Sequence, residues 1–269
     1  MNQPNLDDYQ EFLQELIRIR KDSNINRKIV HQFLAQHKNK LDLNFAEIIT
    51  QWFNAEIDPN NSEGNQDLAS LLNNIAIDIK NFPLGSRLNN IEIAIACYEN
   101  TLTVYTKDAL PEDWAMTQNN LAIAYSDRIK GSRADNLESA IACYESALTV
   151  YTKDAFPYEW VTTQNNLAAA YSDRIKGSRA DNLERAIACY ESALTVYTKD
   201  ALPQDWAMTQ NNLANAYKNR IKGSRADNLE RAIACFENSL TVYTKDDFPQ
   251  DWSQTQNNLA LAYRDRVRD

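Results

Sequence analysis

The sequence predicts an all-α fold, a solenoid of antiparallel helix pairs preceded by a helical block. Two observations predict it. The chain repeats with a fixed period, because four tryptophans recur every 46 residues and each begins a nearly identical passage: Trp114, Trp160, Trp206 and Trp252. Within each passage, apolar residues recur at the spacing of a helix face, and no segment has the alternation of a strand. Helix pairs of this size cannot bury their apolar faces alone, so neighbouring pairs are expected to stack.

Residues 1–67 lie outside the repeats and are expected to form an N-terminal helical block. Helical periodicity occurs in three segments of it: 6–20, 25–37 and 43–56. The polar run 58–65 reads as a break between elements. We expect the block to cap the first repeat, because a solenoid needs its apolar end covered.

Residues 68–269 are expected to form the array. The period divides it into repeats 68–113, 114–159, 160–205 and 206–251, followed by a half repeat, 252–269. At the end of the half repeat, Asp269 stands where the other copies have Gly. A solvated terminal helix and a boundary within a longer chain both fit that observation.

The first helix of a repeat is predicted at 111–130. Pro111 suits a helix start, Arg128 and Lys130 would lie in the last turn, and Gly131 would end the helix in a left-handed conformation. The expected apolar face consists of Trp114, Leu121, Ala122, Tyr125 and Ile129.

The second helix is predicted to begin at Asp135, with Glu138 three residues later in a capping-box spacing. Its expected buried face consists of Leu137, Ala140, Ile141, Tyr144, Leu148 and Tyr151.

These motifs resemble the tetratricopeptide (TPR) repeat. Leu121-Ala122 with Tyr125, followed by Ala140 and Tyr144, is similar to its signature, and the resemblance covers residues 68–269. The period is longer than the usual TPR period of about 34 residues. The repeats therefore look most like the elongated TPRs of kinesin light chains and the TPR arrays of cyanobacterial proteins that carry a caspase-like CHAT protease domain. The resemblance implies a right-handed superhelix that serves as a binding scaffold.

Composition excludes several function classes. The net charge of −9 disfavours nucleic acid as a partner, since its affinity comes mainly from Lys and Arg. There is no basic, apolar leader and no long apolar stretch, so we expect no membrane partner and a cytoplasmic location. Both histidines lie in the first forty residues and the five glycines are far apart. We therefore expect no enzyme: no catalytic residues, no metal site and no cofactor.

Two repeated features are expected to be structural. Cys97, Cys143, Cys189 and Cys235 occur once per repeat, on the order of 10 Å apart, too far for disulfides or zinc, so we expect core thiols. In three of the second-helix loops an Arg lies two residues before an Asp: Arg133 before Asp135, Arg179 before Asp181 and Arg225 before Asp227. We expect these residues to form ion pairs that order the loop.

A pair of asparagines in each first helix is the main candidate for binding. Asn is a poor helix former, yet the pair recurs in every copy, and one carboxamide can both donate to and accept from a peptide backbone. Elongated TPRs resemble this arrangement in carrying Asn arrays along the concave groove. The alternative, that these amides tie adjacent first helices together, stays open. The candidate residues are Asn74, Asn119, Asn120, Asn165, Asn166, Asn211, Asn212, Asn257 and Asn258.

The copies differ mainly on the helix face that carries these pairs, which suggests specificity for one ligand or drift after duplication. Ile123, Asn215 and Lys218 are the variable residues we place in the groove. Asp127 and Asp173 would make its rim acidic, which disfavours a clamp for a C-terminal carboxylate.

The expected function is a non-catalytic scaffold that binds an extended peptide or a partner protein along the concave groove. Two alternatives remain. The array could be the sensor or regulatory region of a larger signalling enzyme such as a TPR-CHAT protease. It could also be a structural array that assembles end to end.

Overall fold

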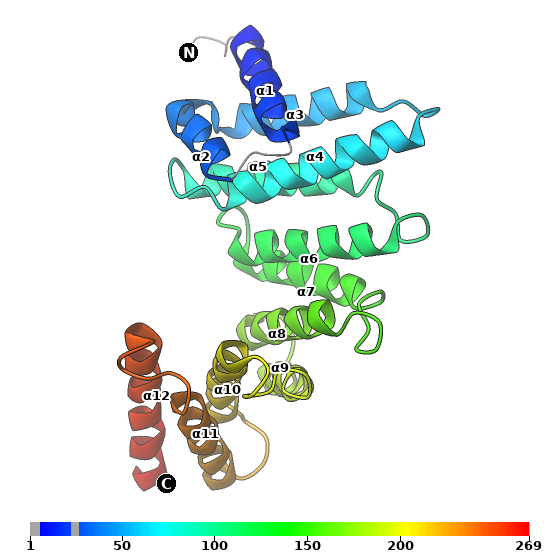
Figure 1. The fold of residues 1–269 in the computed structure, drawn as a ribbon. Coiled ribbons are helices and arrows are strands. Elements are labelled where there is room, and N and C mark those ends of the chain that lie inside the picture. The colour runs from blue at the N-terminus through cyan, green and yellow to red at the C-terminus, as the bar shows by residue number, and fades with distance from the viewer. Residues whose placement is uncertain (1–5, 23–26, 269) are drawn as a thin grey trace. The chain divides into compact units, whose positions relative to one another are not determined.

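The computed structural model describes residues 6–22 and 27–268, and throughout these ranges the regular elements are helices (Figure 1). The chain divides into two compact units, residues 1–150 and 151–269. Consecutive helices pack in pairs within each unit, as expected for a TPR-like solenoid. The predicted all-α repeat architecture is therefore confirmed.

The first unit holds the N-terminal block and two helix pairs. Its elements are α1 (Leu6–Lys21), α2 (Arg27–Gln36), a short 3₁₀ helix (Lys38–Lys40), α3 (Leu43–Glu56), α4 (Ser62–Lys80), α5 (Arg87–Thr101), α6 (Pro111–Asp127) and α7 (Arg133–Ala147). The block lies against the first pair, since α1 and α2 pack on α4 and α3 packs on α5. The first two residues of the helix predicted at 25–37 lie outside the described ranges.

The block and the first pair share one apolar core. Side chains from both are fully buried in it, including Leu16, Leu34, Phe45, Phe53, Leu72, Ile75 and Tyr98. Helix α4 begins inside the segment predicted to be a break, because the Asn61 side chain accepts a hydrogen bond from the Gly64 amide at 2.9 Å. A polar run can thus supply a helix cap as well as a turn.

The second unit continues the same pattern. Its helices are α8 (Pro157–Asp173), α9 (Arg179–Ala193), α10 (Pro203–Lys218), α11 (Arg225–Leu240) and α12 (Pro249–Arg268). Helices α8 and α9 form one pair and α10 and α11 the next, with α12 packed on α11. Each first helix begins with a proline, as predicted for Pro111.

The first helix of a repeat ends earlier than predicted. Helix α6 stops at Asp127, and Arg128 is extended, with φ −62° and ψ 128°. Ile129, expected on the buried face, is 58% exposed. The prediction was wrong here because the Arg128 side chain bonds to Glu92 on the preceding helix α5, a contact that periodicity along one helix cannot show.

The loop between the two helices is fixed by three residues. Gly131 adopts the left-handed conformation, at φ +81°, that its sequence position predicted. Ser132, and not Asp135 as predicted, caps α7 by accepting from the Asp135 amide. The buried Asn136 side chain donates to the carbonyls of Lys130, at 2.9 Å, and Arg128, at 3.3 Å.

Candidate binding groove

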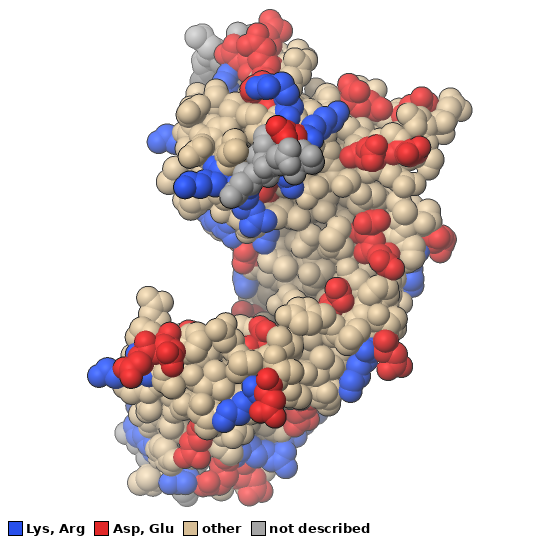
Figure 2. All heavy atoms as spheres, in the orientation of Figure 1, with Lys and Arg blue, Asp and Glu red and all other residues tan. Residues whose placement is uncertain are grey.

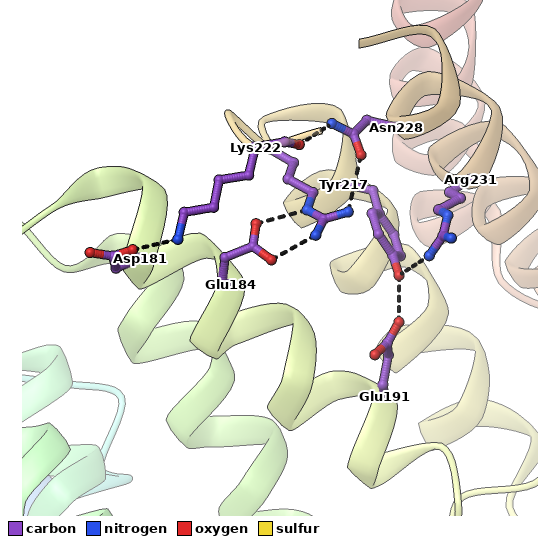
Figure 3. Close-up of polar contacts among 8 residues, drawn as sticks. Asp181, Glu184, Glu191, Tyr217, Lys222, Asn228 and Arg231 are labelled. Carbon is purple, nitrogen blue, oxygen red and sulfur yellow. Dashed lines mark hydrogen bonds and ion pairs between the residues drawn. The ribbon is translucent and has the colours of Figure 1, made fainter. Parts of the chain in front are cut away.

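Ion pairs join each helix pair to the next first helix within a unit. In the second unit, Arg220 Nε and Nη2 donate to the two carboxylate oxygens of Glu184, each at 2.7 Å (Figure 3). The pKa of Glu184 is lowered because Arg220 stabilises its ionised form. Arg128 and Glu92 make the same contact in the first unit, at 2.7 and 2.8 Å. The two Arg–Glu pairs therefore stabilise the packing between consecutive repeats.

Tyrosines in three first helices, α6, α10 and α12, make a second link. Tyr125 donates to Glu99 on α5 at 2.6 Å, and Tyr217 donates to Glu191 on α9. Arg231 on α11 donates to the same Tyr217 hydroxyl at 3.1 Å, so this tyrosine connects three helices of the second unit (Figure 3). Burial is the main reason why the pKa of Tyr217 is raised.

The first asparagine of each pair ties neighbouring first helices in the second unit. Thr209 Oγ1 on α10 donates to Asn165 Oδ1 on α8 at 3.2 Å, and Thr255 Oγ1 on α12 donates to Asn211 Oδ1 at 3.3 Å. Asn165 is 6% exposed. The structural alternative for the Asn pairs therefore accounts for these two residues.

The second asparagine of each pair is placed differently. Asn120, Asn166, Asn212 and Asn258 are all half-buried. In the part of the chain that the structure describes, none of these four side chains forms a hydrogen bond with another residue. A carboxamide can donate two hydrogen bonds and accept two, so these amides remain able to bind a ligand.

A hollow of about 260 Å³ lies between α8, α9 and α10. Three of the predicted site residues, Asp173, Asn212 and Asn215, contribute to its wall. Arg179 and Tyr190 of α9 and Asn219, just after α10, also line it, and the sequence-based prediction missed all three. The shape and the mixture of charge and amides suit a polar chain segment lying against the first helices.

The remaining predicted site residues do not line this hollow. Asn74, Asn119, Ile123 and Lys218 are half-buried, whereas Asn257 is exposed. Asp127 is exposed and its Oδ2 accepts from Arg87 Nη2 at 2.8 Å. Asn215, which does line the hollow, donates from its side chain to the Asn211 carbonyl at 3.0 Å. Their role in binding remains a prediction.

The loop ion pairs form differently from the prediction. Asp181 pairs with Lys222, at 2.7 Å, and not with Arg179. Arg87 pairs with Asp127, which lies 40 residues later, and Arg225 with Asp265, at 3.7 Å. The two Arg–Asp pairs join residues 40 apart, so a comparison of the sequence at that separation could have found them.

Neither metal binding nor membrane insertion is indicated by the residues that the structure describes. Over residues 6–22 and 27–268, no group of three His, Cys, Asp or Glu side chains could hold a metal ion. In the same ranges, no helix has the length and apolar character needed to cross a membrane. On the face drawn in Figure 2, acidic and basic side chains are scattered among uncharged ones.

Two family models match parts of the chain. Residues 114–149 are similar to the family described as Tetratricopeptide repeat, and residues 150–266 to the family described as Soluble NSF attachment protein, SNAP. No curated protein sequence matches the chain. Both families mediate protein–protein interactions and are typically non-catalytic, so they point to a protein-interaction scaffold. The finer resemblance to kinesin light chains and CHAT-linked arrays remains a prediction.

Proposed function

We propose that this chain is a scaffold that binds an extended peptide segment of a partner protein along its first helices. The second asparagine of each pair would bond the peptide backbone, and the variable residues Ile123, Asn215 and Lys218 would select its side chains. The observation that carries the proposal is that the two asparagines of a pair differ in their hydrogen bonds. Asn211 accepts from Thr255, whereas Asn212 lines a hollow with its amide unengaged.

The chemistry of an extended backbone supports this role. A peptide that is not in a helix or sheet presents an N–H and a C=O at each residue, and both lose hydrogen bonds to water when it binds. A half-buried carboxamide replaces both bonds without contacting the peptide side chain. Amides recurring every 46 residues would therefore hold a chain whatever its sequence, leaving selectivity to the residues that vary between copies.

Matched substitutions in one Asn pair test the proposal. A peptide selected from a random display library on the full chain would serve as the ligand, with affinity measured by fluorescence anisotropy and folding by thermal unfolding. Asn212→Ala should weaken binding by about 1 kcal/mol, roughly fivefold, and leave the melting temperature nearly unchanged. Asn211→Ala is the control. It should lower the melting temperature, because Thr255 loses its acceptor, and affect affinity less.

The opposite pattern would count against the groove. If Asn212→Ala lowers the melting temperature and the affinity per folded molecule stays the same, then both amides are structural. Failure of the selection to yield any peptide that binds the folded chain would also argue against a peptide-binding scaffold.

A further inference from the structure

Each second helix begins with an arginine, and one of these arginines lacks the aspartate that stands 40 residues after each of the others. The four are Arg87, Arg133, Arg179 and Arg225, one per repeat. Arg87 bonds to Asp127 at 2.8 Å, and Arg225 lies 3.7 Å from Asp265; in both pairs the aspartate comes 40 residues after the arginine. The residue 40 positions after Arg179 is Asn219. The amide is similar in size to the carboxylate but carries no charge.

The guanidinium of Arg179 is therefore not neutralised. It donates to the backbone carbonyl of Ser172, and no carboxylate in the described ranges lies within ion-pair distance of it. The residue before Asn219 also differs between repeats. Lys218 occupies the position in α10 that Ser126 has in α6 and Ser172 has in α8. Both changes make the end of α10 more positive than the corresponding end of α6 or α8.

The unpaired guanidinium lines the hollow together with three amides. Asn212, Asn215 and Asn219 come from α10 and the residue after it, and each amide can donate N–H bonds to an oxyanion. The guanidinium is planar, and its two parallel N–H groups match the two oxygens of a carboxylate. One wall of the hollow thus carries a charge and donors suited to an anion.

Asp173 limits which anion can bind. Its carboxylate lines the same hollow, so a doubly charged group such as phosphate meets more repulsion there than a singly charged one. A singly charged carboxylate beside Arg179 and Asn219 therefore meets less repulsion from Asp173 than a phosphate would.

We propose that Arg179 and Asn219 bind the side-chain carboxylate of an Asp or Glu in the peptide that lies along the groove. This inference rests on the proposed function, because it assumes that a peptide passes through the hollow. It goes further in naming the kind of residue that the second unit selects. It also gives a binding role to Arg179, which the sequence analysis expected only to order the loop.

Nuclear magnetic resonance of the full chain tests the site without a peptide. The probe is N-acetyl-glutamic acid α-amide, which has one side-chain carboxylate, and the control is the neutral N-acetyl-glutamine α-amide. The Nε–Hε signal of Arg179, assigned by its loss in Arg179→Gln, should shift and saturate with the glutamic compound only. Asn219→Asp should abolish the saturable shift, because it restores the acidic partner that Arg87 and Arg225 have.

Two further arms separate the alternatives. Arg225→Gln removes one positive charge at the same register outside the hollow, and should leave the Arg179 response unchanged. Inorganic phosphate should shift the signal more weakly than the glutamic compound. A stronger response to phosphate, equal responses to the acidic and neutral compounds, or a response that survives in Asn219→Asp would overturn the proposal.

The peptide selection distinguishes this inference from the function on which it rests. Selected peptides should contain an Asp or Glu whose replacement by Asn or Gln weakens binding by about threefold to fivefold in the natural chain. The same replacement should change nothing in Asn219→Asp. Peptides that bind well without any acidic residue would leave the scaffold function intact and refute the role of Arg179.

Discussion

The guanidinium of Arg220 holds both carboxylate oxygens of Glu184, a residue 36 positions earlier and on the preceding helix pair. Arg128 holds Glu92 in the first unit at the same separation. Each contact joins a second helix to the end of the next first helix. The ion pairs therefore link consecutive repeats, in addition to the apolar packing between them.

Breaking this link should destabilise the second unit. Glu184→Gln is expected to lower the free energy of unfolding by about 1 to 2 kcal/mol, since it weakens two charge-assisted hydrogen bonds in a partly buried site. Urea unfolding followed by circular dichroism measures the change. Asp181→Asn is the matched control, because the pair of Asp181 with Lys222 is exposed and its loss should have little effect. Equal effects of the two substitutions would show that the bidentate geometry adds nothing.

The same pair predicts a pH dependence. The pKa of Glu184 is lowered in the folded chain, whereas an unfolded glutamate has a pKa of about 4.3. The stabilisation is thus fully present above about pH 4.3 and is lost as the pH falls through the lower folded value. The stability difference between the natural chain and Glu184→Gln should be constant from neutral pH to mildly acidic pH and then shrink. A difference that grows on acidification would contradict the assigned contact.

The four cysteines should be nearly inert in the native protein. Cys97 is fully buried, whereas Cys143, Cys189 and Cys235 are half-buried, so the expectation of core thiols holds fully only for Cys97. Partial burial still raises the pKa of Cys143 and of Cys235 to about 11. Compared with an unfolded thiol of pKa about 8.5, the thiolate fraction near pH 8 is lower by about a hundredfold or more. Labelling by a thiol reagent should be slow until denaturant is added. Fast native labelling of two or more cysteines, or stoichiometric zinc binding, would contradict the core assignment.

Removing one complete repeat should leave a folded protein. Deletion of residues 160–205, which removes most of α8 and all of α9, joins two passages in the same register. Helical content per residue should stay the same while the urea midpoint falls, because each repeat contacts only its neighbours. Deletion of α9 alone is the control and should disrupt folding, since it brings two first helices into sequence. Complete unfolding of the in-register deletion would argue against a solenoid.

The sequence predicts the helices better than it predicts the contacts between repeats. The 46-residue period and the apolar spacing locate each pair, and the limits of α3 match those predicted, 43–56. Periodicity describes one helix at a time, so it placed Ile129 in the core and missed the contact of Arg128 with Glu92. The pairing of Arg87 with Asp127 and of Arg225 with Asp265 depends on how one helix pair is rotated against the next. That rotation results from packing between repeats. In the sequence it is visible only as Arg and Asp residues separated by 40 positions.

The buried amides in the loops limit where a repeat can change its length. Asn90, Asn136, Asn182 and Asn228 each donate to loop carbonyls at the same offset, such as Lys176 from Asn182, at 2.9 Å, and Lys222 from Asn228, at 2.8 Å. One inserted residue would move those carbonyls away and leave a buried amide unsatisfied. Insertions are therefore expected to be tolerated only in the other turn, such as 102–110, where no such buried amide bonds to the chain. Tags, linkers and grafted binding loops belong at that turn.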